Sequence, residues 1–440
     1  MIDPRQAQFP IDGSRDALWM ETATEAPDTA SVNGQLRCDV AIIGAGFTGL
    51  NAALQLARQG ISVTVLEAKN LGYGASGRSG GQVNLGLNLL PSELIAKFGD
   101  KPGNRLIQLV LRAPDHVFDL IERHQMRCDP VRNGWIQAAI NQDHEAKHKK
   151  LFLDYAQHGY HQFERLDQTQ LGKLTGTSRY QSGLLSPNAG SIQPLSYTRE
   201  LARAAMENGA SIFTDSAVTG LQREPDGWRL STNRGQLKCE QALICTNGYT
   251  GPLSNGLHKK LLPIRSVLIA SEPLPAHLRE SILPNQVTLV DKRRLVMYMR
   301  YDRDGRLCIG DHGPARDAFT LDDFEPVKRR AIDVFPQLKN IVWDYHWGGR
   351  VAMTRSKIPF LYRIAPGLTA AMGYNGRGVG MGSIMGKTVA DTILRRDDEQ
   401  SEFPVTLPKN FLLHRFHSAG ASMTVQWLAL LDHLDSIQRQ

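Results

Sequence analysis

The chain has 440 residues, 41% of them hydrophobic and 22% charged, as is usual for a soluble globular protein of two or three domains. Its net charge of +7 comes from short, separated basic clusters without interleaved aromatic residues, which argues against a nucleic-acid partner. No apolar run is long enough to span a membrane and the N-terminus lacks a signal-peptide pattern, so we expect no integral membrane segment.

The five cysteines are scattered along the chain, and none belongs to a C-x-x-C pair. This arrangement argues for reduced thiols and against a disulfide framework or a metal site. We therefore expect a cytoplasmic protein.

The N-terminal region is polar and rich in turn signals, and we expect an irregular arm over residues 1–35, anchored by Trp19. A wholly apolar run, Val40–Ile43, follows and is typical of a strand buried in a parallel sheet. Periodicity then predicts a helix from Phe47 to Gln59 and a second strand from Ile61 to Leu66.

The turn between the first strand and this helix carries the pattern G-x-G-x-x-G, formed by Gly44, Gly46 and Gly49. These glycines allow a tight turn, let a pyrophosphate approach the backbone, and let the helix pack on the strand. Glu67 ends the second strand, where a carboxylate can accept hydrogen bonds from both ribose hydroxyls. The spacing therefore predicts a dinucleotide site for FAD or NAD, and the acidic residue disfavours NADP.

Two glycine-rich loops stand out further along the chain, at residues 70–82 and 373–382, the second lying between a strand and a helix at 383–395. Hydrophobic periodicity predicts other helices at residues 91–124 (kinked or split at Pro114), 143–158, 195–208 and 324–335. Strands are predicted at residues 210–213, 217–221, 228–232, 241–245, 262–301, 306–309 and 342–347. The spacing of apolar residues in 411–434 favours a packed segment over membrane docking.

Several stretches, taken in order, point to one family: CDVAIIGAGFTGL, LEAKNLGYGASGRSGGQ, GSIQPLSYTREL, FPQLKNIVWDYHWGG and GYNGRGVGMG. Over nearly its whole length the chain resembles the D-amino-acid-oxidase-type FAD oxidoreductases, the superfamily of glycine and sarcosine oxidases. Within that superfamily it is most similar to the γ-glutamylputrescine oxidases.

The resemblance implies an α/β fold in which a discontinuous, Rossmann-like FAD-binding domain is interleaved with an antiparallel-sheet substrate domain. We assign residues 36–90, 185–255 and 346–396 to the FAD-binding domain, and residues 91–184 and 256–345 to the substrate domain. The arm 1–35 precedes them, and a C-terminal segment 397–440 follows.

The resemblance also implies which residues hold non-covalent FAD, since the cysteine that tethers FAD in sarcosine oxidases has no counterpart near Val351–Met353. The expected cofactor-binding residues are Gly44, Gly46, Phe47, Thr48, Gly49, Glu67, Ala68, Ala75, Ser76, Gly77, Arg78, Gly80, Gly81, Gln82, Val218, Thr246, Asn247, Gly248, Gly373, Asn375, Gly376, Arg377, Gly378 and Val379. For Arg78, an ordinary surface position is an equal alternative.

The chain departs from its relatives at two positions. Amino-acid oxidases of this superfamily place an arginine where this chain has Val351, and Arg350 stands one place earlier. Because one residue of offset turns a strand side chain to the opposite face, a simple α-amino acid is disfavoured as substrate unless a bulge restores Arg350. Second, Cys308 stands where sarcosine oxidases carry the lysine that helps oxygen react, so the electron acceptor is O₂ or a quinone.

The leading interpretation is oxidation of an amine, most simply a γ-glutamylated diamine such as γ-glutamylputrescine, in polyamine catabolism. The alternatives are oxidation of a cyclic or N-alkyl amino acid such as L-pipecolate, and a flavin-binding protein without turnover. Candidate substrate-pocket residues are His312, Tyr374 and Arg350, and Arg377 or Arg355 could hold a distal carboxylate. Tyr298 and Tyr301 are further candidates for the pocket wall.

Overall fold

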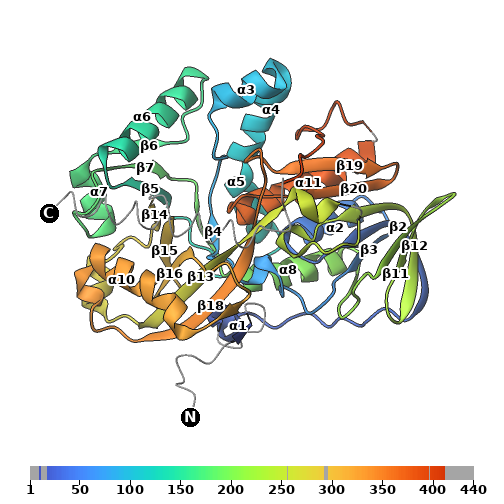
Figure 1. Ribbon diagram of the computed structural model, residues 1–440, viewed down its shortest axis with the longest axis horizontal. Coiled ribbons are helices and arrows are strands. Elements are labelled where there is room, and N and C mark those ends of the chain that lie inside the picture. The colour runs from blue at the N-terminus through green and yellow to red at the C-terminus, as the bar shows by residue number, and fades with distance from the viewer. Residues whose placement is uncertain (1–8, 11–16, 255, 292–295, 396, 412–440) are drawn as a thin grey trace, which may run out of the picture.

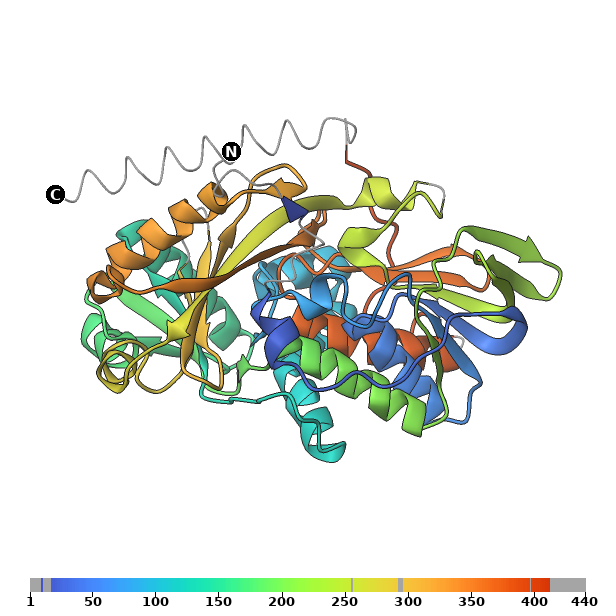
Figure 2. The ribbon, with the colours of Figure 1, turned by 90° about the horizontal axis from the view of Figure 1, so that it is seen from below.

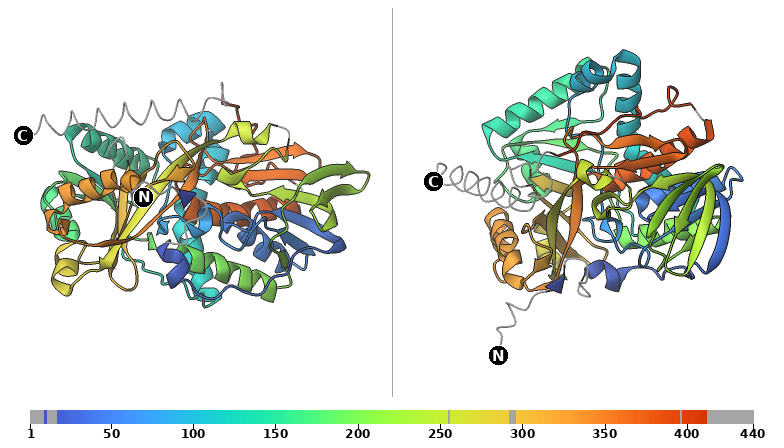
Figure 3. Two further views of the ribbon diagram at one scale, coloured as in Figure 1. Left: turned by 60° about the horizontal axis from the view of Figure 1, so that its bottom comes forward. Right: turned by 45° about the vertical axis from the view of Figure 1, so that its right-hand side comes forward.

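The structure is a computed structural model that describes residues 9–10, 17–254, 256–291, 296–395 and 397–411. Within these ranges two eight-stranded sheets dominate, and Figure 1 shows them as two lobes lying side by side. One sheet is mainly parallel and the other mainly antiparallel, as predicted. Figures 2 and 3 show the long strands β13 (Leu262–Pro273) and β18 (Trp343–Met353) spanning the middle of the molecule.

The first sheet is built on the parallel strands β12, β2, β3 and β9, with β20 beside β12. Its apolar central strands are buried on both faces, as parallel strands generally are. Strands β10, β11 and β19 join it in antiparallel fashion. Its strands are β2 (Gly34–Ile43), β3 (Val63–Leu66), β9 (Ser211–Phe213), β10 (Gly220–Glu224), β11 (Gly227–Ser231), β12 (Gly235–Ile244), β19 (Phe360–Ala365) and β20 (Leu368–Met372).

Three helices cover one face of this sheet, and Figure 2 shows them next to one another: α2 (Phe47–Ala57), α8 (Pro194–Glu207) and α11 (Gly378–Arg395). Helix α2 lies in the middle and packs on both neighbours. A Cβ atom on Gly49 would lie 2.0 Å from the carbonyl oxygen of Gly44, so only glycine lets α2 begin this close to the end of β2. This tight turn is the one that the G-x-G-x-x-G pattern predicts.

The second sheet has the order β18-β13-β16-β15-β14-β5-β7-β6, antiparallel except between β14 and β5. Alternation along its strands sends Leu289 and Met299 into a core shared with α10 (Glu325–Val334). Trp135, Val290 and Tyr298 point to the other side, toward the first lobe. Its remaining strands are β5 (Trp135–Ala139), β6 (Glu164–Leu166), β7 (Ser182–Ser186), β14 (Thr288–Asp291), β15 (Met297–Tyr301) and β16 (Arg306–His312).

The remaining elements are shorter or peripheral. The helices are α1 (Leu18–Thr22), α3 (Pro91–Phe98), α4 (Asp100–Leu111), α5 (Ala113–Arg123), α6 (Gln142–Gln157), α7 (Gln168–Thr175) and α9 (Ala276–Ser281). Strand β1 (Phe9–Pro10) pairs with β17 (Ala318–Phe319), and β4 (Gln82–Val83) with β8 (Gly190–Ser191). Short 3₁₀ turns occur at Ala75–Gly77, Asn247–Tyr249, Leu257–Lys260, Leu321–Phe324 and Pro336–Leu338. No described helix is both long and apolar enough to cross a bilayer.

Several predicted boundaries need correction. The 262–301 stretch is not continuous strand, because α9 interrupts it after Pro275. The strand predicted at 217–221 begins only at Gly220. The N-terminal arm contains the helix α1, in which Trp19 is fully buried, so the predicted anchor is present. The helical stretch 91–124 breaks at Gly99 and Arg112, and Pro114 lies in the first turn of α5, where its missing N–H costs no hydrogen bond.

The division into two domains stays a prediction, although sheet membership bears on two boundaries. The boundary between residues 184 and 185 lies inside β7, a strand of the second sheet. The expected boundary at residue 346 lies inside β18, and β18 pairs with β13 from Trp343 to Met353. By sheet membership, the substrate part therefore extends to about residue 353. Of the predicted C-terminal segment, residues 397–411 are described and residues 412–440 lie outside the described ranges.

Candidate functional site

One cavity of about 1950 Å³ lies between the two sheets. Its wall runs from the carboxyl ends of β2 and β3 to Trp135, Val290 and Tyr298 of the second sheet. Small-molecule sites usually measure about 300–1,000 Å³, so this cavity has room for a dinucleotide and a second ligand. The predicted site residues gather here, and all of them line the cavity except Gly49, Gly77, Gly248, Gly373 and Tyr301.

The start of α2 and the end of β3 form one end of the cavity. The N–H of Phe47 donates to Ser76 Oγ at 3.0 Å, which brings the 76–82 loop against the positive end of α2. The two carboxylate oxygens of Glu67 accept the N–H groups of Ala45 (2.8 Å) and Lys69 (3.1 Å). Burial raises the pKa of Glu67 although these hydrogen bonds oppose the shift. A carboxylate has further acceptor sites, so Glu67 can still bind ribose hydroxyls.

The 76–82 loop is fixed from the side that faces away from the cavity. Three N–H donors from distant segments hold three consecutive carbonyl groups: Trp347 Nε1 donates to Arg78 O (3.0 Å), Trp19 Nε1 to Ser79 O (2.9 Å) and Arg300 Nε to Gly80 O (2.7 Å). In a planar trans peptide the N–H points opposite to the preceding carbonyl. The N–H of Gly80 therefore points away from these donors and Gly80 lines the cavity, whereas the N–H of Gly81 donates to Ser79 Oγ at 3.4 Å.

Tyr298 packs directly on this loop. A Cβ on Gly80 would lie 2.5 Å from its ring, so glycine allows the tyrosine to approach. The Tyr298 hydroxyl contacts Ser266 Oγ at 3.1 Å, and Ser266 Oγ donates to the backbone oxygen of Asp311 at 2.7 Å. Tyr301, in contrast, donates to the carbonyl of Ile282 on the far side of the sheet and does not line the cavity.

The late glycine loop reaches the cavity with its backbone, because its polar side chains are used to hold the loop in place. Asn375 Oδ1 accepts the N–H of Thr354 at 2.8 Å, and Asn247 Oδ1 accepts the N–H of Gly373 at 2.9 Å. The Tyr374 hydroxyl contacts Thr48 Oγ1 at 2.6 Å and donates to the carbonyl of Ala371 at 3.1 Å. Tyr374 thus presents a ring to the cavity while its hydroxyl is already bonded.

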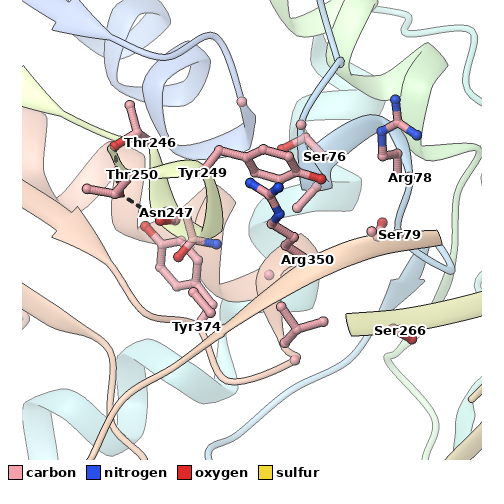
Figure 4. Close-up of a pocket in the computed structure, with 18 of the residues that line it drawn as sticks. Ser76, Arg78, Ser79, Thr246, Asn247, Tyr249, Thr250, Ser266, Arg350 and Tyr374 are labelled. Carbon is pink, nitrogen blue, oxygen red and sulfur yellow. Dashed lines mark hydrogen bonds between the residues drawn. The ribbon is translucent and has the colours of Figure 1, made fainter. Parts of the chain in front are cut away.

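Figure 4 shows the central part of the cavity, where the Arg350 guanidinium lies over the ring of Tyr249. The distance from Arg350 Cζ to the ring centroid is 5.2 Å. The dashed lines mark two hydrogen bonds of the Thr250 hydroxyl, one with Thr246 Oγ1 (2.7 Å) and one to the carbonyl of Asn247 (2.7 Å). These bonds fix the turn after β12. Arg78 stacks on Tyr73 at 5.3 Å and donates to its carbonyl, a contact within the loop.

The register of β18 decides where Arg350 points. Its pairing with β13 runs without a shift from Leu262↔Met353 to Ala270↔Tyr345, so no bulge turns the chain at this position. Arg350 therefore shares a face with its cross-strand partner Arg265, and Val351 faces the other way. Both arginines bind Asp317, Arg265 at 2.9 Å and Arg350 at 3.2 Å. Burial alone would raise the pKa of Asp317, but these two guanidinium groups hold that pKa below its ordinary value.

His312 lines the cavity beside Ser266, and a buried carboxylate orients it. Its Nδ1 lies 2.6 Å from Asp311 Oδ1, and the other oxygen of Asp311 accepts a hydrogen bond from Arg330 at 2.6 Å. An ionised Asp311 fixes the tautomer with the proton on Nδ1, which makes Nε2 the acceptor. Cys308 is buried on the same strand and does not line the cavity, and its cross-strand partner is Arg300.

The two remaining predicted cations lie in different surroundings. Arg377 is 7% exposed, stacks on Trp135 at 5.3 Å, and donates to Leu85 O and to Asn88 Oδ1. Arg355 is exposed and reaches the carbonyl of Asn410 at 3.4 Å. The cavity wall therefore includes a deeply buried guanidinium, that of Arg377, which donates to neutral acceptors.

These features fit FAD. An acidic residue stands where a ribose is expected, the start of α2 offers a positive end to a diphosphate, and residues of the 76–82 loop and of the start of α11 line the cavity. The size of the cavity matches such a ligand. The geometry of the cavity thus agrees with the sequence motifs.

A family model described as FAD dependent oxidoreductase (DAO) matches residues 39–392. The chain belongs to this family. Among its relatives, a probable oxidoreductase OrdL of Haemophilus influenzae is 33% identical over 90% of this chain and 92% of its own length. The gamma-glutamylputrescine oxidoreductase of Escherichia coli K12 is 31% identical over 91% of this chain and 92% of its own length.

Solved structures show the same fold. Glycine oxidase from Geobacillus kaustophilus superimposes with a TM-score of 0.69 at 20% identity, covering 84% of this chain and 99% of its own. L-Proline dehydrogenase from P. horikoshii superimposes with a TM-score of 0.68 at 19% identity, covering 83% of this chain and 95% of its own. As a member of the DAO family, the chain is an FAD-dependent oxidoreductase that acts on amines or amino acids.

Several wall residues were not predicted from the sequence: Asn84, Trp135, Tyr249, Ser266 and Asp311. Tyr249 stands in the CTNGYT motif and could have been inferred from it. The others lie in strands or loops without a motif, and only the packing of the second sheet on the first brings them to the cavity.

Proposed function

We propose that this member of the DAO family oxidises an elongated amine, a γ-glutamylated diamine such as γ-glutamylputrescine. The observation that carries the proposal is the ion pair between Arg350 and Asp317. The unbroken register between β13 and β18 places the Arg350 side chain on the opposite face of β18 from Val351. Arg350 lines the cavity, but its charge is already paired with Asp317, whereas a substrate whose carboxylate adjoins the reacting carbon needs an arginine that is not bound to a protein carboxylate. The 31% identity to a gamma-glutamylputrescine oxidoreductase over nearly both chains supports the same substrate class.

Bound FAD would supply the acceptor for a hydride from the carbon next to the amine nitrogen, and the resulting imine would hydrolyse to an aldehyde and ammonia. The chain's residues must bind the amine in its neutral form, because an ammonium group has no lone pair to assist loss of the hydride. In our proposal His312 Nε2 accepts the proton of the incoming ammonium group, and Asp311 positions the ring through Nδ1. The aromatic and aliphatic wall of Tyr298, Val290 and Leu268 lowers the polarity around that nitrogen.

The proton-acceptor role is tested by the pH profile of flavin reduction. Replacing His312 by Gln should shift the acidic limb of the profile to higher pH, because the amine must then lose its proton to water. Asp311→Asn should produce an intermediate shift. Equal rates at all pH values in both variants would refute the role of His312, whatever the substrate.

The substrate is tested anaerobically, by mixing the FAD-loaded protein with γ-glutamylputrescine and then with L-pipecolate while following the visible absorbance of the flavin. Rapid bleaching by the γ-glutamyl amine and little by pipecolate is the expected result. Bleaching by pipecolate alone would show that a cation does clamp an α-carboxylate and would overturn the proposal. Re-oxidation of the bleached protein by O₂ or by a quinone then identifies the electron acceptor, and we propose a cytoplasmic location for the reaction.

A further inference from the structure

Three residues at one end of the cavity wall each carry a buried polar atom without a hydrogen-bond partner among the described residues. The atoms are Arg377 Nε, Trp135 Nε1 and Asn84 Oδ1. Their side chains are 7%, 1% and 8% exposed, so bulk water does not satisfy them. Unpaired buried polar groups are rare in native proteins, because each costs the energy of its lost hydration. Three of them on one wall indicate a missing ligand.

The three groups come from separate segments that the fold brings together. Trp135 begins β5 of the second sheet, Asn84 follows β4, and Arg377 precedes α11 of the first lobe. Arg377 Cζ lies 5.3 Å from the centroid of the Trp135 ring. One of its terminal nitrogens donates to the carbonyl of Leu85, the residue after Asn84. The cluster therefore lies where the two lobes meet.

The charge of Arg377 is not neutralised by the protein. Its two terminal nitrogens donate to neutral acceptors, the carbonyl of Leu85 and the side-chain oxygen of Asn88, at 2.9 Å for the latter. Burial lowers the pKa of Arg377 to about 10, against a smaller opposing effect of Tyr155. At neutral pH the group is thus still a cation, buried and without a carboxylate partner in the described ranges. A ligand that carries an anion would supply the missing countercharge.

The chemical pattern of the cluster is specific. It offers two N–H donors, one on a cation, and one amide oxygen that accepts. A carboxylate satisfies the two donors, and an ammonium group on the neighbouring carbon satisfies the acceptor. We propose that Arg377, Trp135 and Asn84 bind the free α-amino-acid end of the substrate, remote from the amine that is oxidised. This inference rests on the proposed function and defines its substrate class as amines that carry an α-amino-acid group at the opposite end.

The test measures binding without turnover. The FAD-loaded protein is titrated calorimetrically with γ-glutamylpropylamide, which keeps the amino-acid end and lacks the amine to be oxidised. N-Propylbutanamide, which lacks the amino-acid end, is the matched ligand. The expected result is binding of the first ligand only, weakened about 10- to 100-fold in Arg377→Met and about 10-fold in Trp135→Phe, which keeps the ring and loses the N–H. Arg377→Lys should restore part of the affinity.

Arg355→Gln is the matched control, because it removes the other cavity arginine that could hold a distal carboxylate. Loss of binding in Arg355→Gln with none in Arg377→Met would overturn the assignment. The assignment would also be overturned if Arg377→Met and Trp135→Phe both lowered the affinity for FAD and left binding of the amide unchanged, because the cluster would then hold the cofactor. Arg377-dependent binding of the amide without flavin reduction by γ-glutamylputrescine would support the subsite while refuting the proposed function. Rapid reduction with an unchanged KM in Arg377→Met would refute the subsite alone.

Discussion

Arg300 offers the sharpest test of how the 76–82 loop is held. Its side chain is 4% exposed and donates to three carbonyl groups: Gly80 O (2.7 Å), Ile192 O (2.7 Å) and Tyr301 O (2.8 Å). It also stacks on Trp19 at 4.6 Å. Burial lowers the pKa of Arg300, so its charge is held at a cost that the three hydrogen bonds offset. The bond to Gly80 holds the loop directly, and the bond to Ile192 holds it indirectly, because the N–H of Ile192 donates to the carbonyl of Gly81.

Replacing Arg300 by Met keeps a long apolar side chain and removes every donor. Each buried carbonyl left without a donor costs about 1–3 kcal/mol, and removal of a buried charge returns part of that sum. If the ordered conformation of the loop is destabilised by about 1.5–3 kcal/mol, the dissociation constant of FAD should rise about 10- to 100-fold, since 1.4 kcal/mol corresponds to a factor of ten.

The assay is a fluorescence titration of the apoprotein with FAD, together with urea unfolding of the same apoprotein. Arg303→Gln is the control, because Arg303 lies on the same hairpin, is half exposed and makes only long ion pairs of 3.6 and 3.8 Å. The control should bind FAD like the native chain. Native FAD affinity in Arg300→Met would refute the reasoning, because it would mean that the loop keeps its shape without these donors.

Three further predictions concern the cofactor end and acid stability. Gly49→Ala places a Cβ 2.0 Å from the Gly44 carbonyl and should lower the free energy of unfolding by about 3 kcal/mol or more, measured in urea. Burial raises the pKa of Glu67, so FAD affinity should fall as pH decreases through that pKa and the carboxylate is protonated, whereas Glu67→Gln should bind more weakly with a flat profile. Burial, with smaller effects of Lys387 and Arg123, lowers the pKa of His116 to about 4. Because the unfolded chain protonates this histidine near pH 6.5, the free energy of unfolding should fall by up to about 3 kcal/mol as the pH decreases from 6.5 to 4. His116→Gln should lose that part of the pH dependence of stability.

The sequence predicted the parts of the fold whose physics is local. The β2–α2–β3 unit follows from an apolar run, a glycine turn and a helical period that all lie within thirty or so residues, and Glu67 was placed by its position after the second strand. The break before α9 was missed because residues 276–281 carry too few apolar positions to show a helical period. The match of the chain to the DAO family confirms the cofactor that these local signals indicated.

The far end of the cavity could not be predicted, because its residues meet only through tertiary pairing. Trp135 reaches the wall because β5 pairs with β14 in parallel register, which places Trp135 beside Thr288, a residue far away in the sequence. Arg377 was singled out by its place in the late loop, but neither its burial nor the neutral character of its partners can be read from neighbouring residues. The same holds for Asp317, whose ion pairs with Arg265 and Arg350 require the unbroken register of β13 and β18.

The loop beside the flavin site illustrates why the two lobes act as one unit. Its three carbonyl groups are held by an N-terminal tryptophan, a strand tryptophan and an arginine of a second strand, 60, 269 and 220 residues away in sequence. Any motion that separates the second sheet from the first would release two of these donors and expose the carbonyls of Arg78 and Gly80. Binding of FAD to the first lobe and correct packing of the second are therefore thermodynamically linked: a ligand that needs the ordered loop also stabilises the contact between the lobes. Substrate specificity, set in our proposal at Trp135 and Arg377, depends on that same contact.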